Sequence, residues 1–126
     1  MPGVVQIANR SRGTELASRA EVARSAWRRL IGLIGRRELP LGAGLVLPGT
    51  PWVHTALMRF PLDLVFYDRR GVVLLVVPSL APWRLSPFCR RAGGVIELPA
   101  GAATASGTRC GDALSFSPLT SQAPLP

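Results

Sequence analysis

The chain has 126 residues, of which 48% are hydrophobic, and this length is enough for one domain with a substantial core. The composition argues against a disordered chain, and no apolar run approaches the roughly 18 residues that a membrane-spanning helix requires. The formal net charge is +8, carried by 15 arginines without any lysine. This charge suggests nucleic-acid binding, but the arginine bias also fits a GC-rich gene and aromatic residues are few, so nucleic-acid binding is a lesser alternative.

The N-terminus and the cysteines bear on the cellular compartment. The first ten residues lack an early positive charge and a continuous apolar stretch, which predicts that there is no signal peptide. Cys89 and Cys110 are the only cysteines and form no C-x-x-C arrangement, so we expect reduced, buried or inactive thiols instead of a zinc site or a disulfide framework. The sequence therefore predicts a cytoplasmic protein with no cofactor and no metal.

The first third of the chain predicts a hairpin followed by a helix. A β-rich run over residues 4–8 and a polar turn over 9–13 precede a second strand over 14–22, although a capping box at 18–21 would instead start a helix there. We prefer the strand. Ser25 is a suitable N-cap for a basic amphipathic helix that ends near Ile34. Its apolar stripe consists of Trp27, Leu30, Ile31 and Ile34.

The remainder of the chain is mostly β. Strands are predicted over residues 45–47, 62–67, 72–77, 95–98 and 113–116. The pair around the tight turn at 68–71 is apolar on both faces, so we expect this hairpin at the centre of the sheet. Residues 78–91, with three prolines, are expected to form an extended surface loop, and 102–106 one helical turn. The globular domain is expected to span 1–117, followed by a frayed tail over 118–126.

Polar groups that could carry a function concentrate between Trp52 and Asp63. If residues 53–58 are extended, His54 and Met58 share one face of the strand. Arg59 and Asp63 flank Pro61 and are expected to form a partly buried ion pair across the bend. The candidate site residues are His54, Thr55, Met58, Arg59 and Asp63.

Three functions are compatible with this segment. The leading hypothesis is a non-enzymatic binding or accessory module for an unknown small ligand or protein. An alternative is a small hydrolase or transferase, in which His54 acts as general base oriented by Asp63 while Arg59 holds an anionic substrate, but a nucleophile is lacking and no metal-ligand spacing recurs. In a purely structural interpretation, His54 forms a hydrogen bond inside the fold and the Arg59–Asp63 pair ties two strands together.

Several motifs resemble the domain-of-unknown-function 192 family, also called uncharacterised protein family 0127. The resemblance covers about Ala23 to Phe116 and rests on Arg29 to Arg36, Val53 to Phe66, Glu97 to Gly101 and Gly111-Asp112. The chain is similar to a subgroup that has His and Arg in the central motif. The resemblance implies an α+β fold, a small, strongly curved, partly barrel-like antiparallel sheet with one packed amphipathic helix, and it implies no known activity.

Overall fold

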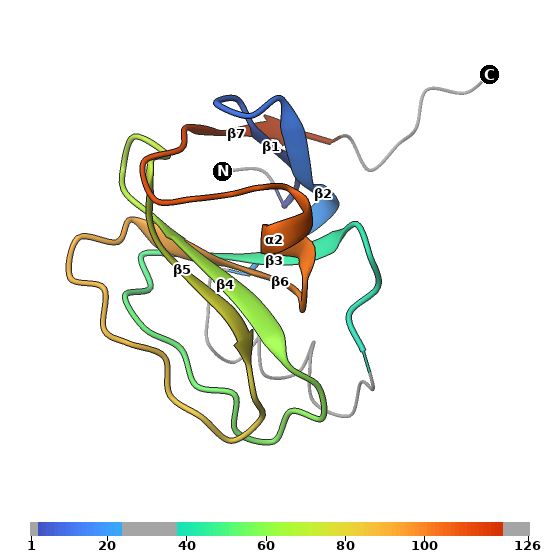
Figure 1. Cartoon of the computed structure of the whole chain (residues 1–126), viewed down its shortest axis with the longest axis vertical. Coiled ribbons are helices and arrows are strands. Elements are labelled where there is room, and N and C mark those ends of the chain that lie inside the picture. Colours follow the sequence, from blue (N-terminus) through green and yellow to red (C-terminus); the bar gives the residue numbers. More distant parts are fainter. Residues whose placement is uncertain (1–2, 24–37, 120–126) are drawn as a thin grey trace.

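The computed structural model describes residues 3–23 and 38–119, which within these ranges form a strongly curled sheet and one short helix (Figure 1). The elements are β1 (Val4–Asn9), β2 (Thr14–Val22), β3 (Ala43–Pro48), β4 (Leu62–Tyr67), β5 (Val73–Leu80), β6 (Gly94–Pro99), α2 (Ala102–Ala105) and β7 (Leu114–Pro118). Every predicted strand is present, including the strand over residues 14–22. The helix expected from Ser25 to Ile34 lies outside the described residues.

The seven strands form one sheet in the order β5-β4-β6-β3-β2-β1-β7. All neighbouring pairs are antiparallel except β2 and β3, which run parallel. The expected antiparallel sheet is therefore corrected to a mixed one. The physical reason is the long connection between β2 and β3, because only a crossover of a dozen or more residues can return the chain to a parallel neighbour.

The curl of the sheet brings its two edge strands, β5 and β7, close to each other at one end of the half-barrel. The amide of Val73 in β5 donates to the carbonyl of Asp112 (2.8 Å), and the amide of Leu114 in β7 donates to the carbonyl of Gly71 (2.9 Å). Beyond Val73, no backbone hydrogen bond joins β5 to β7 in the part of the chain that the structure describes. The sheet is therefore a half-barrel closed at one end, in agreement with the partly barrel-like shape that the family resemblance implies.

Two apolar clusters cover the two faces of the sheet. β4 and β6 are buried along their whole length. Side chains alternate along a strand, so Ile96 and Leu98 point to the interior of the half-barrel while Val95 points to the outer cluster. The connection before β4 supplies Val53, Met58 and Phe60 to that outer cluster.

The prediction that the β4–β5 hairpin lies at the centre of the sheet is wrong. β5 is an edge strand, and β3 occupies the middle position between β6 and β2. The apolar residues on both faces of β4 reflect the two clusters that cover it. Burial of both faces is a property that an off-centre strand can share, so the pattern does not determine strand order.

β5 continues to Leu80 and so extends into the expected loop over 78–91. Proline is accepted in an edge strand, where no neighbour requires its missing N–H, and Pro78 therefore does not end β5. Ser79 adopts a left-handed conformation (φ 49°) at the register shift between β4 and β5. This irregularity turns the Ser79 amide toward Asp63, to which it donates a hydrogen bond of 2.8 Å.

The described residues are mostly β, and the α+β class is supported only loosely. α2 is their only helix and matches the single helical turn predicted at 102–106. No helix within the described ranges is long and apolar enough to cross a membrane. Most of the expected tail, from residue 120 onward, lies outside the described residues.

Candidate functional site

The connections that follow β3 and β5 run alongside each other at the lower end of the half-barrel in Figure 1. We call residues 51–61 and 81–92 the two-loop unit. Backbone hydrogen bonds join the two loops, from Ser86 to the carbonyl of Val53 (2.9 Å) and from Cys89 to the carbonyl of Pro51 (2.8 Å). The expected surface loop is thus tied to the segment that contains the candidate site residues.

Thr55 is the residue that joins the loops most closely. It is completely buried. Its amide donates to the carbonyl of Arg84 and its carbonyl accepts from the amide of Trp83, both at 2.9 Å. Its hydroxyl donates to the carbonyl of Ala81 (2.6 Å) and accepts from the amide of Arg84 (2.9 Å). Thr55 therefore positions the second loop and is not accessible to a ligand.

Residues 53–58 do not form the expected extended strand. Only His54 makes an antiparallel bridge, with Leu85, and the chain then turns through Leu57, whose φ is 68°. Met58 consequently packs into the outer cluster with 4% exposure, whereas His54 is half-buried on the loop. The prediction that His54 and Met58 share one face is wrong, because the turn breaks the alternation on which it depended.

The predicted ion pair between Arg59 and Asp63 is also wrong. Asp63 is completely buried and its carboxylate accepts hydrogen bonds from three amides, those of Ser79, Gly101 and Ala103. Arg59 is exposed. Arg59 and Pro61 precede β4 and lie outside the sheet. Asp63 lies within β4, opposite Leu98, and its side chain points to the interior of the half-barrel.

Asp63 is therefore not placed to orient His54 as the enzyme hypothesis expected, because its carboxylate binds three amides. The Nδ1 of His54 accepts the amide of Ala56 (3.3 Å), and the ring of His54 lies 6.3 Å from the ring of Trp52. Asp63 and Glu97 are neighbours on β4 and β6 but lie on opposite faces, since Asp63 is opposite Leu98 and Glu97 is opposite Leu64. The two buried acids thus cannot act as a carboxylate pair on one substrate.

The thiols add no activated nucleophile. Both cysteines are free; Cys89 is half-buried and Cys110 is exposed. Burial raises the pKa of the half-buried Cys89 thiol, which reduces its thiolate fraction at neutral pH. Within residues 3–23 and 38–119, no three His, Cys, Asp or Glu side chains come together as metal ligands.

The most distinctive property of the two-loop unit is its exposed apolar side chains, which the sequence reasoning missed. Six large hydrophobic residues are exposed among those described, and five of them belong to this unit. These five, which we call the apolar patch, are Trp52, Leu57, Trp83, Leu85 and Phe88, with exposures from 44% to 69%. Two aromatic residues in a proline-rich loop, Trp83 and Phe88, could have indicated this exposed patch from the sequence.

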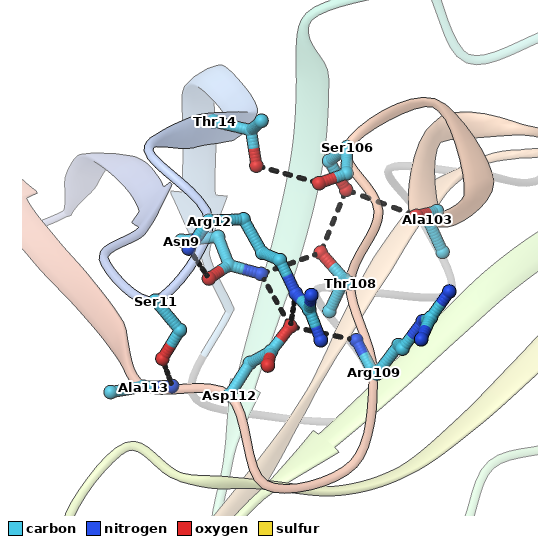
Figure 2. Close-up of polar contacts among 10 residues, drawn as sticks. All are labelled: Asn9, Ser11, Arg12, Thr14, Ala103, Ser106, Thr108, Arg109, Asp112 and Ala113. Carbon is cyan, nitrogen blue, oxygen red and sulfur yellow. Dashed lines mark hydrogen bonds and ion pairs between the residues drawn. The ribbon is translucent and has the colours of Figure 1, made fainter.

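A second polar assembly lies at the closed end of the half-barrel. Asn9, Arg12 and the amide of Arg109 all donate to one oxygen of Asp112, at 2.9, 3.1 and 2.9 Å (Figure 2). Asn9 also donates to the hydroxyl of Thr108. These bonds, the one from Asn9 first, lower the pKa of Asp112 to about 2. The assembly locks the β1–β2 turn to the loop before β7.

Comparisons with known proteins extend this picture. No protein of curated function matches the chain. A solved structure of a protein of unknown function from Novosphingobium aromaticivorans DSM 12444 is 22% identical, covers 89% of this chain and 83% of that one, and has a TM-score of 0.70. A protein from Sinorhizobium meliloti 1021 described as a "putative transcription regulator" is 24% identical, covers 90% and 92%, and has a TM-score of 0.75.

These two structures show a shared fold and no more, because the identities are low. The family evidence is more direct. The sequence profile of DUF192, described as "Uncharacterized ACR, COG1430", matches residues 7–116, which is most of the chain. This protein belongs to the DUF192 family.

Proposed function

We propose that this protein is a non-enzymatic binding module that recognises a protein partner through the apolar patch. The observation that carries the proposal is the backbone beneath two exposed patch residues, Leu57 and Trp83. Both adopt left-handed conformations, with φ of 68° and 62°. Such conformations are unfavourable for residues other than glycine and concentrate at functional sites.

The residue types around the patch are suited to binding the surface of another protein. Tryptophan and arginine are the residues that most often dominate binding energy at protein interfaces. The arginines Arg59, Arg84, Arg90 and Arg91 are exposed in the same two loops, and neither loop contains an acidic residue. The partner that this surface would favour is a segment with apolar side chains flanked by carboxylates.

The contacts of Thr55 support a preformed surface. Its hydrogen bonds hold the second loop at Ala81, Trp83 and Arg84. A surface that is already ordered loses less conformational entropy on binding than a mobile loop does. Of the five candidate residues named from the sequence, His54 and Arg59 are accessible beside the patch. The proposed recognition surface therefore includes these two and excludes the buried Thr55, Met58 and Asp63.

The alternative of a hydrolase or transferase gains no support from these contacts. Asp63, which was to orient His54, instead binds three amides, and the raised pKa of Cys89 disfavours its thiolate. The proposal therefore assigns His54 a binding role at the edge of the patch.

A selection of displayed random peptides tests the proposal. Peptides are selected on the wild-type protein and their dissociation constants are measured by calorimetry on the wild type and on a Trp83→Ser variant. We expect peptides with aromatic or aliphatic residues next to Asp or Glu, and a loss of affinity of at least about tenfold in Trp83→Ser.

The matched control is Leu41→Ser. Leu41 is 87% exposed but lies outside the two-loop unit, so its replacement removes a similar apolar surface elsewhere and is expected to leave the affinity unchanged. Peptides that bind wild type and Trp83→Ser equally well, or a failure to enrich any peptide, would contradict the proposal.

A further inference from the structure

Four segments that are distant in the sequence meet at the closed end of the half-barrel. The amide of Arg10 donates to the carbonyl of Ala113 (2.8 Å), which joins the β1–β2 turn to the loop before β7. The bond from Leu114 to Gly71 adds the β4–β5 turn. The amide of Gly93 donates to the carbonyl of Tyr67 (2.7 Å), which brings the end of the β5–β6 loop against the same turn.

These segments gather much of the positive charge of the protein, and we call them the arginine end. Its seven arginines are Arg10, Arg12, Arg69, Arg70, Arg90, Arg91 and Arg109. All seven are exposed, and they are nearly half of the 15 arginines in the chain. The acids within the same segments are Asp68 and Asp112, so seven positive and two negative charges leave an excess of five.

Two of these arginines are held in place by carboxylates. Asp112 accepts from Nε of Arg12 (3.1 Å), and Asp68 accepts from Nη2 of Arg70 (3.2 Å). A guanidinium has five N–H donors, so an aspartate on one edge orients the group while the other edge can meet a second anion. The side chain of Arg12 is 41% exposed, and Figure 2 shows its guanidinium beside the loop that carries Arg109.

We propose that the arginine end binds the phosphate backbone of double-stranded nucleic acid without reading base sequence. A phosphate backbone presents many negative charges to this excess of positive charge, and each arginine can donate two parallel hydrogen bonds to a phosphate. This site goes beyond the proposed protein recognition: it shares Arg90 and Arg91 with the two-loop unit, but none of the side chains of the apolar patch belongs to it.

Five of the seven arginines lie on three turns, and the composition of these turns favours nucleic acid over other anions. Residues 10–13, 68–71 and 107–113 contain no large apolar side chain, whereas membrane insertion and the centres of protein interfaces require such groups. They also contain no aromatic side chain on which an unpaired base could stack. Backbone contacts to a duplex are therefore the binding mode that these residues support.

Fluorescence anisotropy with a fluorescein-labelled duplex of about 20 base pairs tests this inference. If about four phosphates are neutralised, the affinity falls about a hundredfold between roughly 50 and 200 mM salt, with a slope of log K against log salt near −0.9 per phosphate. Arg69→Gln and Arg109→Gln are each expected to weaken binding and to reduce the slope by about 1.

The matched control is Arg19→Gln, which removes the same charge from an exposed position on β2, outside the arginine end. It is expected to leave the slope unchanged, as is Trp83→Ser, which separates this inference from the proposed function. An equal effect of Arg19→Gln would overturn the inference, because binding would then depend on total charge alone. Tighter binding to a single strand, to anionic phospholipid vesicles or to polyglutamate would overturn the assignment to duplex backbone.

Discussion

At the scale of single residues, Asp63 shows how a buried charge can be satisfied entirely by the main chain. Its three amide donors lie 16, 38 and 40 residues away along the chain. Asp63→Ala would leave these amides without an acceptor in the interior. We expect the free energy of unfolding, measured by urea denaturation, to fall by about 3 kcal/mol or more.

Arg59 provides the comparison. Because Arg59 is exposed and Asp63 is bound elsewhere, Arg59→Ala is expected to change the free energy of unfolding by less than about 0.5 kcal/mol. A double-mutant cycle on the two residues is expected to give a coupling energy near zero. A coupling above about 1 kcal/mol would restore the ion pair that the sequence suggested.

Asp112 makes stability depend on pH. Its pKa is lowered to about 2, chiefly by the hydrogen bond from Asn9, so the carboxylate stabilises the fold at pH values above the ordinary pKa of 3.8. This contribution is lost as the pH falls from about 4 to about 2. Over this range the carboxyl group of Asp112 binds a proton more readily in the unfolded state than in the folded state, which favours unfolding.

The isosteric variant Asp112→Asn isolates this effect. Melting temperatures of wild type and variant, measured from pH 7 to pH 2, are expected to differ above about pH 4 and to converge near pH 2. Asp68 also has a lowered pKa, but it is present in both proteins and cancels in the comparison. A difference in melting temperature that does not change with pH would contradict the assigned role of Asp112.

At the scale of elements, the two-loop unit depends on the hydroxyl of Thr55. Thr55→Val keeps the side-chain shape and removes the bonds to Ala81 and Arg84. We expect a loss of about 2 kcal/mol in the free energy of unfolding. Hydrogen-exchange mass spectrometry should show faster exchange of the amides from residue 83 to residue 86.

Thr50→Val is the control, because the hydroxyl of Thr50 makes only a long bond of 3.4 Å to the carbonyl of Pro48. We expect it to cost less than about 0.5 kcal/mol. If both substitutions had the same effect, Thr55 would not be the residue that holds the loops together.

The positions of the strands were largely predictable, and those of the functional groups were not. β2 (Thr14–Val22) and β4 (Leu62–Tyr67) agree with their expected limits, because alternation and burial act on neighbouring residues. The segment with His54 does belong to the two-loop unit, but its contact with Leu85 joins residues that no local window contains.

At the scale of the whole molecule, the absence of a side chain at Gly94 leaves space for the ring of Tyr67, which connects β4 to β7. Tyr67 of β4 lies opposite Gly94 and packs against Phe116 of β7, with ring centroids 5.0 Å apart. A Cβ at position 94 would collide with the ring of Tyr67 and lie 2.9 Å from the carbonyl oxygen of Leu47. Gly94→Ala is therefore expected to cost on the order of 3 kcal/mol, seen by calorimetry as a lower melting temperature.

Gly3→Ala is the matched substitution, since nothing lies within 4 Å of its Cβ position. We expect its melting temperature to stay close to that of the wild type. Equal melting temperatures for the two variants would mean that Tyr67 can move aside without loss.

Local patterns in the sequence were enough to predict which segments are strands, the short helical turn at α2 and the family of the chain. The order of the strands, the parallel pairing of β2 with β3, the amide partners of Asp63 and the contact of Asn9 with Asp112, which are 103 residues apart, became visible in the folded chain alone. Backbone preferences and alternation act over a few residues, whereas the partners of buried polar groups are set by the path of the whole chain.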